Sequence, residues 1–174
     1  MIRKLAVCST IAALTFLVPI RASDIRRVVT GVDANNKSNA ILDSKITLSP
    51  APNDLNWAHL WVTDSYPLSV SATDTKDKSV GVSPPENGTQ FGVVEIPPSE
   101  LAPAQPVQPL WHQTRTVDYV VVMSGEIDLM LEASVVHLKA GDTVVQQATN
   151  HAWVNRGTVP CRLLFVLMDA KQPG

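Results

Sequence analysis

The sequence predicts an all-β protein, built as a barrel or jelly roll, and three observations carry this prediction. Short stretches of alternating or β-branched residues follow one another at roughly even spacing. Glycine-containing turns at Gly125, Gly141 and Gly157 separate several of them. No stretch of normal helix length repeats its apolar residues at helical spacing. With 174 residues, 45% of them hydrophobic, the chain is long enough for one domain with a core and too short for two ordinary ones.

The expected strands run in order along the chain, and two segments interrupt them. Residues 65–83 are rich in Ser, Thr, Asp and Lys, which predicts a mobile loop. Residues 84–109 hold seven of the 13 prolines, so they are expected as extended loop around one strand, either a lid over the barrel mouth or a simple surface tether. The expected strands are 27–30, 40–48, 57–63, 91–96, 117–123, 127–131, 135–138, 143–147, 151–155 and 162–168.

The N-terminus has the pattern of a secretory signal peptide. A basic start over residues 1–4 precedes an uncharged apolar run over 5–19, and Ala22 suits the last position before cleavage. The run is shorter than the roughly 20 residues that a membrane span needs. We therefore expect residues 1–22 to be a signal peptide and 23–174 a single domain, secreted or periplasmic, with no stable membrane insertion after cleavage. An uncleaved anchor or a misread start codon is the alternative.

Cleavage would change both the charge and the cysteine count. Losing Arg3, Lys4 and Arg21 takes the formal net charge from -2 to -5, and a chain without a basic field is a poor partner for nucleic acid. Cys8 leaves as well, so no disulfide framework remains. Cys161 lies in an apolar run and is expected to be a small buried hydrophobe. Asn36 and Asn87 begin glycosylation sequons, which matter only in a secreting eukaryote.

Two clusters of polar residues have the composition of a site. On a strand, His112, Thr114, Thr116 and Asp118 point to one side, and residues of the same parity further along are valines. A face that changes from polar to apolar in this way favours the lining of a cavity. In the second cluster, His151 shares a face with Trp153 and Asn155.

The first cluster resembles the first motif of the cupin superfamily. That motif runs His-x-His, three or four residues, Glu, six residues, Gly. Here it reads His112-Gln113-Thr114, three residues, Asp118, six residues, Gly125. Thr114 therefore stands at the second His position of the motif, and Asp118 at the Glu position.

The second cluster resembles the second cupin motif, which runs from Gly through Pro-x-Gly to His and, four residues on, Asn. Gly141, His151 and Asn155 match, whereas Gln146 and Ala148 stand at the Pro and Gly positions. The resemblance covers about residues 109–168 and implies a cupin jelly-roll barrel, completed by the N-terminal strands. Residues 116–119 and 149–153 look more narrowly like small one-domain cupins of bacteria and fungal natural-product clusters, described as cupin-domain oxidoreductases.

The resemblance implies a candidate metal site, because metal cupins bind a divalent ion with three His and one Glu. His112, Asp118 and His151 remain, which is the ligand count of a facial triad. We expect either one divalent transition metal (Fe, Mn, Zn or Ni) on these three residues, or none, since Asp is one methylene shorter than Glu.

The expected function is that of a small-molecule enzyme, an oxidoreductase of small-molecule or secondary metabolism, with His112, His151 and Asp118 as catalytic residues in the barrel. One alternative is a metal-free isomerase or dehydratase in which a histidine moves a proton next to a carbonyl. Another is a cupin that binds a small organic molecule without turnover. The polar inner face disfavours a storage barrel. The resemblance also implies a homodimer through N-terminal strands and outer sheet faces.

Other residues receive structural expectations. Asp118 has an alternative role as a salt-bridge partner of Arg115 or Arg162, or as a residue that caps a turn. Glu95 is a further candidate to point into the barrel, from a neighbouring strand. The residues expected to be structural or to lie outside the site are Thr114, Tyr119, Trp111, Trp153, His59 and His137.

Overall fold

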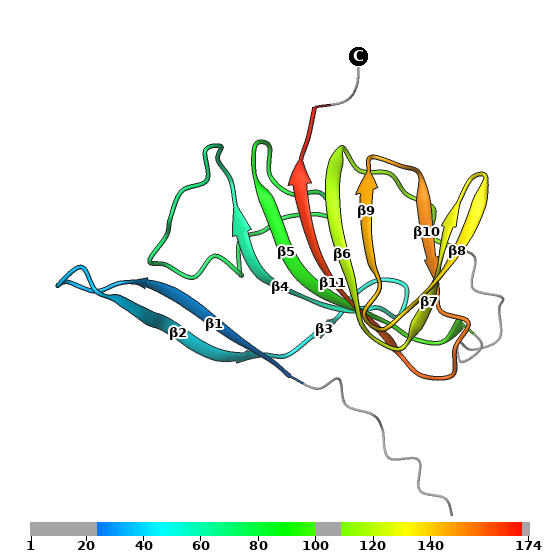
Figure 1. Cartoon of the computed structure of the whole chain (residues 1–174), viewed down its shortest axis with the longest axis horizontal. Coiled ribbons are helices and arrows are strands. Elements are labelled where there is room, and N and C mark those ends of the chain that lie inside the picture. The colour runs from blue at the N-terminus through cyan, green and yellow to red at the C-terminus, as the bar shows by residue number, and fades with distance from the viewer. Residues whose placement is uncertain (1–23, 100–108, 172–174) are drawn as a thin grey trace, which may run out of the picture.

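The structure, a computed structural model, describes residues 24–99 and 109–171, which form antiparallel strands (Figure 1). The expected signal peptide lies outside the described residues, as does part of the proline-rich segment. In chain order the strands are β1 (Ile25–Val32), β2 (Ser38–Ile46), β3 (Ser49–Pro50), β4 (Asn56–Thr63), β5 (Thr89–Ile96), β6 (Thr116–Ser124), β7 (Glu126–Leu131), β8 (Ser134–Lys139), β9 (Thr143–Gln147), β10 (His151–Val154) and β11 (Cys161–Asp169).

Two sheets make the body of the fold and confirm the all-β jelly roll. A six-stranded sheet has the order β3-β4-β5-β11-β6-β9, and a three-stranded sheet has the order β10-β7-β8. The large sheet curves toward the small one (Figure 1). Alternate residues of each sheet point inward and pack together, among them Val122 and Leu163 from the large sheet and Ile127 and Leu129 from the small one.

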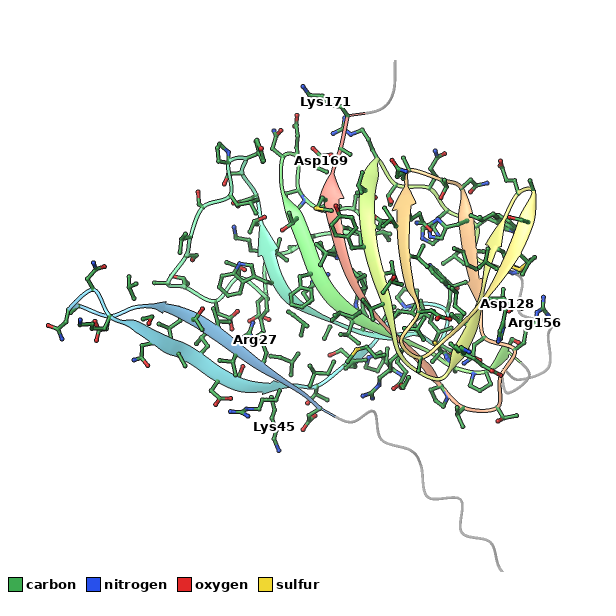
Figure 2. The ribbon with its side chains drawn as sticks, in the orientation of Figure 1. Arg27, Lys45, Asp128, Arg156, Asp169 and Lys171 are labelled. Carbon is green, nitrogen blue, oxygen red and sulfur yellow. The ribbon has the colours of Figure 1, made fainter. Side chains whose placement is uncertain are left out.

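The hairpin β1–β2 stands apart from the two sheets at the left of Figure 1. Ile46 at its end and Leu48 beyond it pack on Leu60 and Val93 of the large sheet. Arg27 of β1, labelled in Figure 2, is only 6% exposed and reaches the carbonyl oxygen of Leu60 at 2.8 Å. The hairpin is thus fastened to the barrel by a small apolar cluster and by one buried guanidinium.

The expected strands are confirmed to within a few residues, with two corrections. Residues 111–115 are not a strand: β6 begins at Thr116, and before it only an isolated bridge pairs His112 with His151. In β4 the register shifts, so that His59 pairs with Gly92 and Trp61 with Phe91. This bulge turns Trp61 away from the face of Trp57, although strict alternation predicts that they share it.

The loop over residues 65–83 contains no strand, as expected. It is nevertheless held to the strands by several contacts, of which two are to β1 and β4. Asp74 forms an ion pair with Arg27, and the Thr75 hydroxyl accepts a hydrogen bond from the Val62 backbone N–H at 3.0 Å. Within the part of the chain that the structure describes, no helix is long and apolar enough to cross a membrane.

Candidate active site

The inner face of the large sheet encloses a cavity of about 680 Å³. Its walls are mostly apolar and include three large aromatic side chains, Trp57, Trp153 and Phe165. One region of the wall is polar. It is formed by His112, Thr114, Asp118, Gln146 and His151. Both sequence clusters therefore reach the same cavity, as their parity predicts.

Strand register places the polar side chains beside one another. Asp118 on β6 lies directly opposite Gln146 on β9, and Val120 two residues along β6 continues the inner face. His151 begins β10 on the small sheet, where it pairs with Leu131 of β7. The polar region thus spans the junction between the two sheets.

His112 and His151 face each other across that junction. Their backbones exchange two hydrogen bonds, from His112 N–H to His151 C=O at 2.9 Å and from His151 N–H to His112 C=O at 3.0 Å. The imidazole centroids are 4.2 Å apart. The pairing is made by backbone, so the closeness of the rings does not depend on the imidazoles themselves.

Hydrogen bonds assign the tautomer of each ring. The Nδ1–H of His112 donates to the Leu110 carbonyl oxygen at 3.0 Å, which makes Nε2 the basic nitrogen. The Nδ1–H of His151 donates to the Thr149 carbonyl oxygen at 2.9 Å, and its Nε2 accepts a hydrogen bond from Gln146 Nε2 at 3.1 Å. The basic nitrogen of His151 is therefore engaged, and that of His112 is left to meet a ligand.

Burial perturbs two of these groups in the same sense, toward the neutral form. Burial raises the pKa of Asp118, while hydrogen bonds from Thr116 and Gln146 and the charge of His112 act to lower it. Burial lowers the pKa of His151; its hydrogen bond to Thr149 opposes this shift, and a charge on His112 adds to it. Burial thus disfavours the charged form of His151, and a proton on His112 disfavours it further.

The predicted ligands do not form a metal-binding arrangement as they stand. Within residues 24–99 and 109–171, no group of three or more His, Cys, Asp or Glu is placed to hold a metal ion. The amide of Gln146 lies between two of the predicted ligands: its Nε2 is 3.0 Å from Asp118 Oδ2 and 3.1 Å from His151 Nε2. As placed, these side chains do not fit a metal ion. Whether a metal binds stays a prediction.

Thr114 is buried, and its hydroxyl lies 2.6 Å from that of Thr116. Asn155 holds a turn together, since its amide nitrogen donates to the carbonyl oxygens of Ile96 and Val159, both at 2.9 Å. Trp153 packs at the core and contacts His151 edge-on, with centroids 5.9 Å apart. The expectation that Trp111 packs inside is wrong, because it is 41% exposed.

The remaining candidates lie away from the polar region. His137 is on the outer surface beside Asp128, which also pairs with Arg156 at 3.0 Å (Figure 2). Glu95 is buried on the opposite face of β5 from the cavity-lining Val94 and pairs with Arg162 at 2.7 Å. Arg115 pairs with Asp169. The two arginines that the sequence offered to Asp118 therefore have other carboxylate partners.

Sequence reasoning missed two glutamines. Gln146 is 5% exposed and joins Asp118 to His151, although its position matched the Pro of the motif. Gln90 is fully buried on β5, lines the cavity and lies next to His59. A polar residue at an inward position of a strand is the signal that both of them carried.

Comparisons with known proteins find similarity to cupin domains. The Cupin_2 family model, described as a cupin domain, matches residues 92–167. Phomopsin biosynthesis cluster protein C' of Diaporthe leptostromiformis is 40% identical over 93 residues, which are 52% of this chain and 45% of that protein. The cupin-domain-containing oxidoreductase srdD of Neurospora crassa is 28% identical over 120 residues, 65% of this chain and 58% of that protein.

The chain thus spans less than half the length of the phomopsin-cluster relative. Among solved structures, the cupin domain of Schizosaccharomyces pombe Cnp3 has 18% sequence identity and a TM-score of 0.43, over 84% of this chain and 87% of that one. The family match covers β6 to β10 and most of β5 and β11, the strands that build the cavity and its polar wall. Residues 92–167 therefore match the cupin domain family.

Proposed function

We propose that this protein is an enzyme that moves a proton on a small, uncharged organic molecule bound inside the barrel. The observation that carries the proposal is the pair of imidazoles on the cavity wall, 4.2 Å apart, of which one has its basic nitrogen engaged and the other does not. A base must lie within hydrogen-bond reach of the proton that it removes, and His112 has the nitrogen for it.

The cavity lining supports an uncharged substrate. Among the described residues that line the cavity, none is Lys or Arg, and the carboxylates present are those of Asp54 and Asp118. A carboxylate or phosphate would enter without a counter-charge, at a large desolvation cost. The aromatic side chains of Trp57, Trp153 and Phe165 offer flat apolar surface instead. A volume of about 680 Å³ is in the usual range for small-molecule sites.

The groups around His112 supply the rest of a proton transfer. When Nε2 takes a proton from a carbon next to a carbonyl, the ring becomes a cation. The carboxylate of Asp118 stabilises that cation, since a charge on His112 and a charge on Asp118 favour each other. Return of the proton to a neighbouring carbon isomerises the substrate, and its transfer to an adjacent hydroxyl, which then leaves as water, dehydrates it. Burial lowers the pKa of His151 beside them, which disfavours its protonation.

A second candidate is oxidation of the same kind of molecule, because relatives of the chain are named cupin-domain-containing oxidoreductases. That reaction needs an electron acceptor in addition to the residues of the polar wall. Other relatives are named for biosynthesis clusters, which supports a substrate from small-molecule biosynthesis in either case.

Proton exchange in D₂O tests the first candidate directly. Uncharged aromatic ketones and aldehydes with exchangeable α-protons are incubated with the protein, and NMR measures loss of the α-proton signal. We expect His112→Ala to abolish exchange, and carboxylate-bearing analogues of the same size to be inert. His137→Ala, on the outer surface, is the matched control and should keep the wild-type rate. Full exchange by His112→Ala would refute the proposal.

The homodimer is also a proposal. The outer face of β6 and β9 exposes Tyr119, Met123 and Val145, at 52%, 46% and 63%, which supports an apolar interface on this face. Light scattering during size exclusion should give twice the monomer mass for the wild-type protein. The Val145→Lys variant should have the mass of one monomer. A monomeric wild-type protein at micromolar concentration would contradict the dimer.

A further inference from the structure

We infer that Gln146 takes the place of a metal ion in this cupin domain, because its amide bridges the two residues that a metal would bridge. Nε2 of Gln146 is 3.0 Å from Asp118 Oδ2 and 3.1 Å from His151 Nε2. The inference does not depend on which reaction the cavity supports.

The chemistry of the partners decides which end of the amide faces them. An ionised carboxylate only accepts hydrogen bonds. The Nε2 of His151 also accepts, because Nδ1–H donates to the Thr149 carbonyl oxygen at 2.9 Å. Two acceptors therefore meet the two N–H groups of one amide, which fits the nitrogen and not the oxygen of Gln146. The lone pairs of Asp118 Oδ2 and His151 Nε2 are engaged in these hydrogen bonds, whereas the buried Asp118 Oδ1 has no hydrogen-bond partner among the described residues.

The β6–β9 pairing and burial fix the position of the Gln146 side chain. It lies opposite Asp118 in the β6–β9 register and is 5% exposed. Thr114, at the position of the second His of the motif, turns its hydroxyl to Thr116 at 2.6 Å. Of the four ligand positions of a metal cupin, one therefore lacks an imidazole, and two are tied to a glutamine.

Gln146 consequently acts as a positioning residue for His151. By donating to Nε2 it stabilises the Nδ1–H tautomer and directs the basic nitrogen at the amide instead of the substrate. His112 then remains as the imidazole with a basic nitrogen for the cavity, and His151 acts through its position beside it.

Metal titration of the wild type and of four variants tests this inference without an activity assay. Mn²⁺, Fe²⁺, Ni²⁺ or Zn²⁺ is added to purified protein, and bound metal is measured after dialysis. Wild type, Thr114→His and the control Gln147→Ala, an exposed glutamine on the same strand, should hold less than about a tenth of an equivalent. Thr114→His combined with Gln146→Ala should hold about one equivalent, since three imidazoles and the Asp118 carboxylate are then present without the bridging amide.

Two results would overturn the inference. One equivalent of metal on the wild type, lost in Gln146→Ala, would make Gln146 a ligand. A folded double variant that takes up no metal would show that something else excludes the ion.

A second readout begins with the wild-type protein alone. The ¹⁵N chemical shifts of the His151 ring in the wild-type protein should report the Nδ1–H tautomer, with a hydrogen-bonded Nε2. Gln146→Ala should move the Nε2 resonance, and Gln147→Ala should leave it in place. An Nε2–H tautomer in the wild type would contradict the bridge.

Discussion

Replacing Asp74 by Asn should weaken the contact between the N-terminal hairpin β1–β2 and the loop over residues 65–83, and so destabilise the protein. The two terminal nitrogens of the Arg27 guanidinium contact the Asp74 carboxylate, NH1 to Oδ1 at 2.8 Å and NH2 to Oδ2 at 2.5 Å. The Arg27 side chain is 6% exposed and that of Asp74 28%. Losing the carboxylate leaves a buried cation without its counter-charge, which is costly because water cannot reach it.

The pKa of Asp74 gives the magnitude. The hydrogen bond from Arg27 lowers that pKa from 3.8 to about 2. At 1.36 kcal/mol per pKa unit, this corresponds to about 2 kcal/mol of stability at neutral pH. Since the folded pKa is lowered, the contribution is fully present above about pH 4 and is lost as pH falls toward 2. The difference between wild type and Asp74→Asn should therefore shrink across that window.

Urea unfolding at pH 7, and thermal melts between pH 5 and 2.5, measure both effects. The neighbouring pair supplies the control: Arg26 also makes a two-point contact, from Nε and NH2 to the Asp43 carboxylate, but the two side chains are 70% and 51% exposed. Asp43→Asn should change the free energy of unfolding by no more than the error of the measurement. If Asp74→Asn costs no more than Asp43→Asn, the hairpin does not depend on the buried pair, and the reasoning fails.

Three further outcomes are expected. A Cβ on Gly92 would meet Phe165 Cζ at 2.5 Å, so Gly92→Ala should lower the free energy of unfolding in urea by about 1–3 kcal/mol. Gly81 has open space around it, so Gly81→Ala should not lower it. Equal stability of the two variants would contradict this reasoning. Burial raises the pKa of the Cys161 thiol to about 11, so thiol reagents at pH 8 should label it only after unfolding, and rapid native labelling would disprove its burial. Intact mass of the protein from its native host should place the first residue near Ser23; a full-length chain would sink the export prediction.

Most strands could be predicted from the sequence, because residues that face the core and residues that face outward alternate and differ in polarity. On β6, Thr116, Asp118, Val120 and Val122 are buried, while Tyr119 between them is exposed. A sheet with one face against a core imposes this period of two on its sequence. The bulge at Leu60 has no such signal, since a run of apolar residues reads the same with or without one extra residue.

The site was predictable in its histidines and not in its connections. His112, Asp118 and His151 all line the cavity, as their parity and motif spacing imply. Gln146 could not be recognised, because its role comes from its register with Asp118 and from His151 on the other sheet. Ion pairs between residues far apart in the sequence could not be predicted either. Arg26 and Arg27 are adjacent arginines, and only the fold decides which one is buried against Asp74.

The backbone bridge between His112 and His151 has a dynamic consequence. The amides of these two residues are held by each other and not by a long ladder, so local opening should expose them to hydrogen exchange before the amides in the centre of β6 and β11. Each opening event separates both rings at once, and with them the polar wall of the cavity. A ligand that touches both imidazoles would bind only the closed form, and would slow exchange at these two amides in proportion to its occupancy.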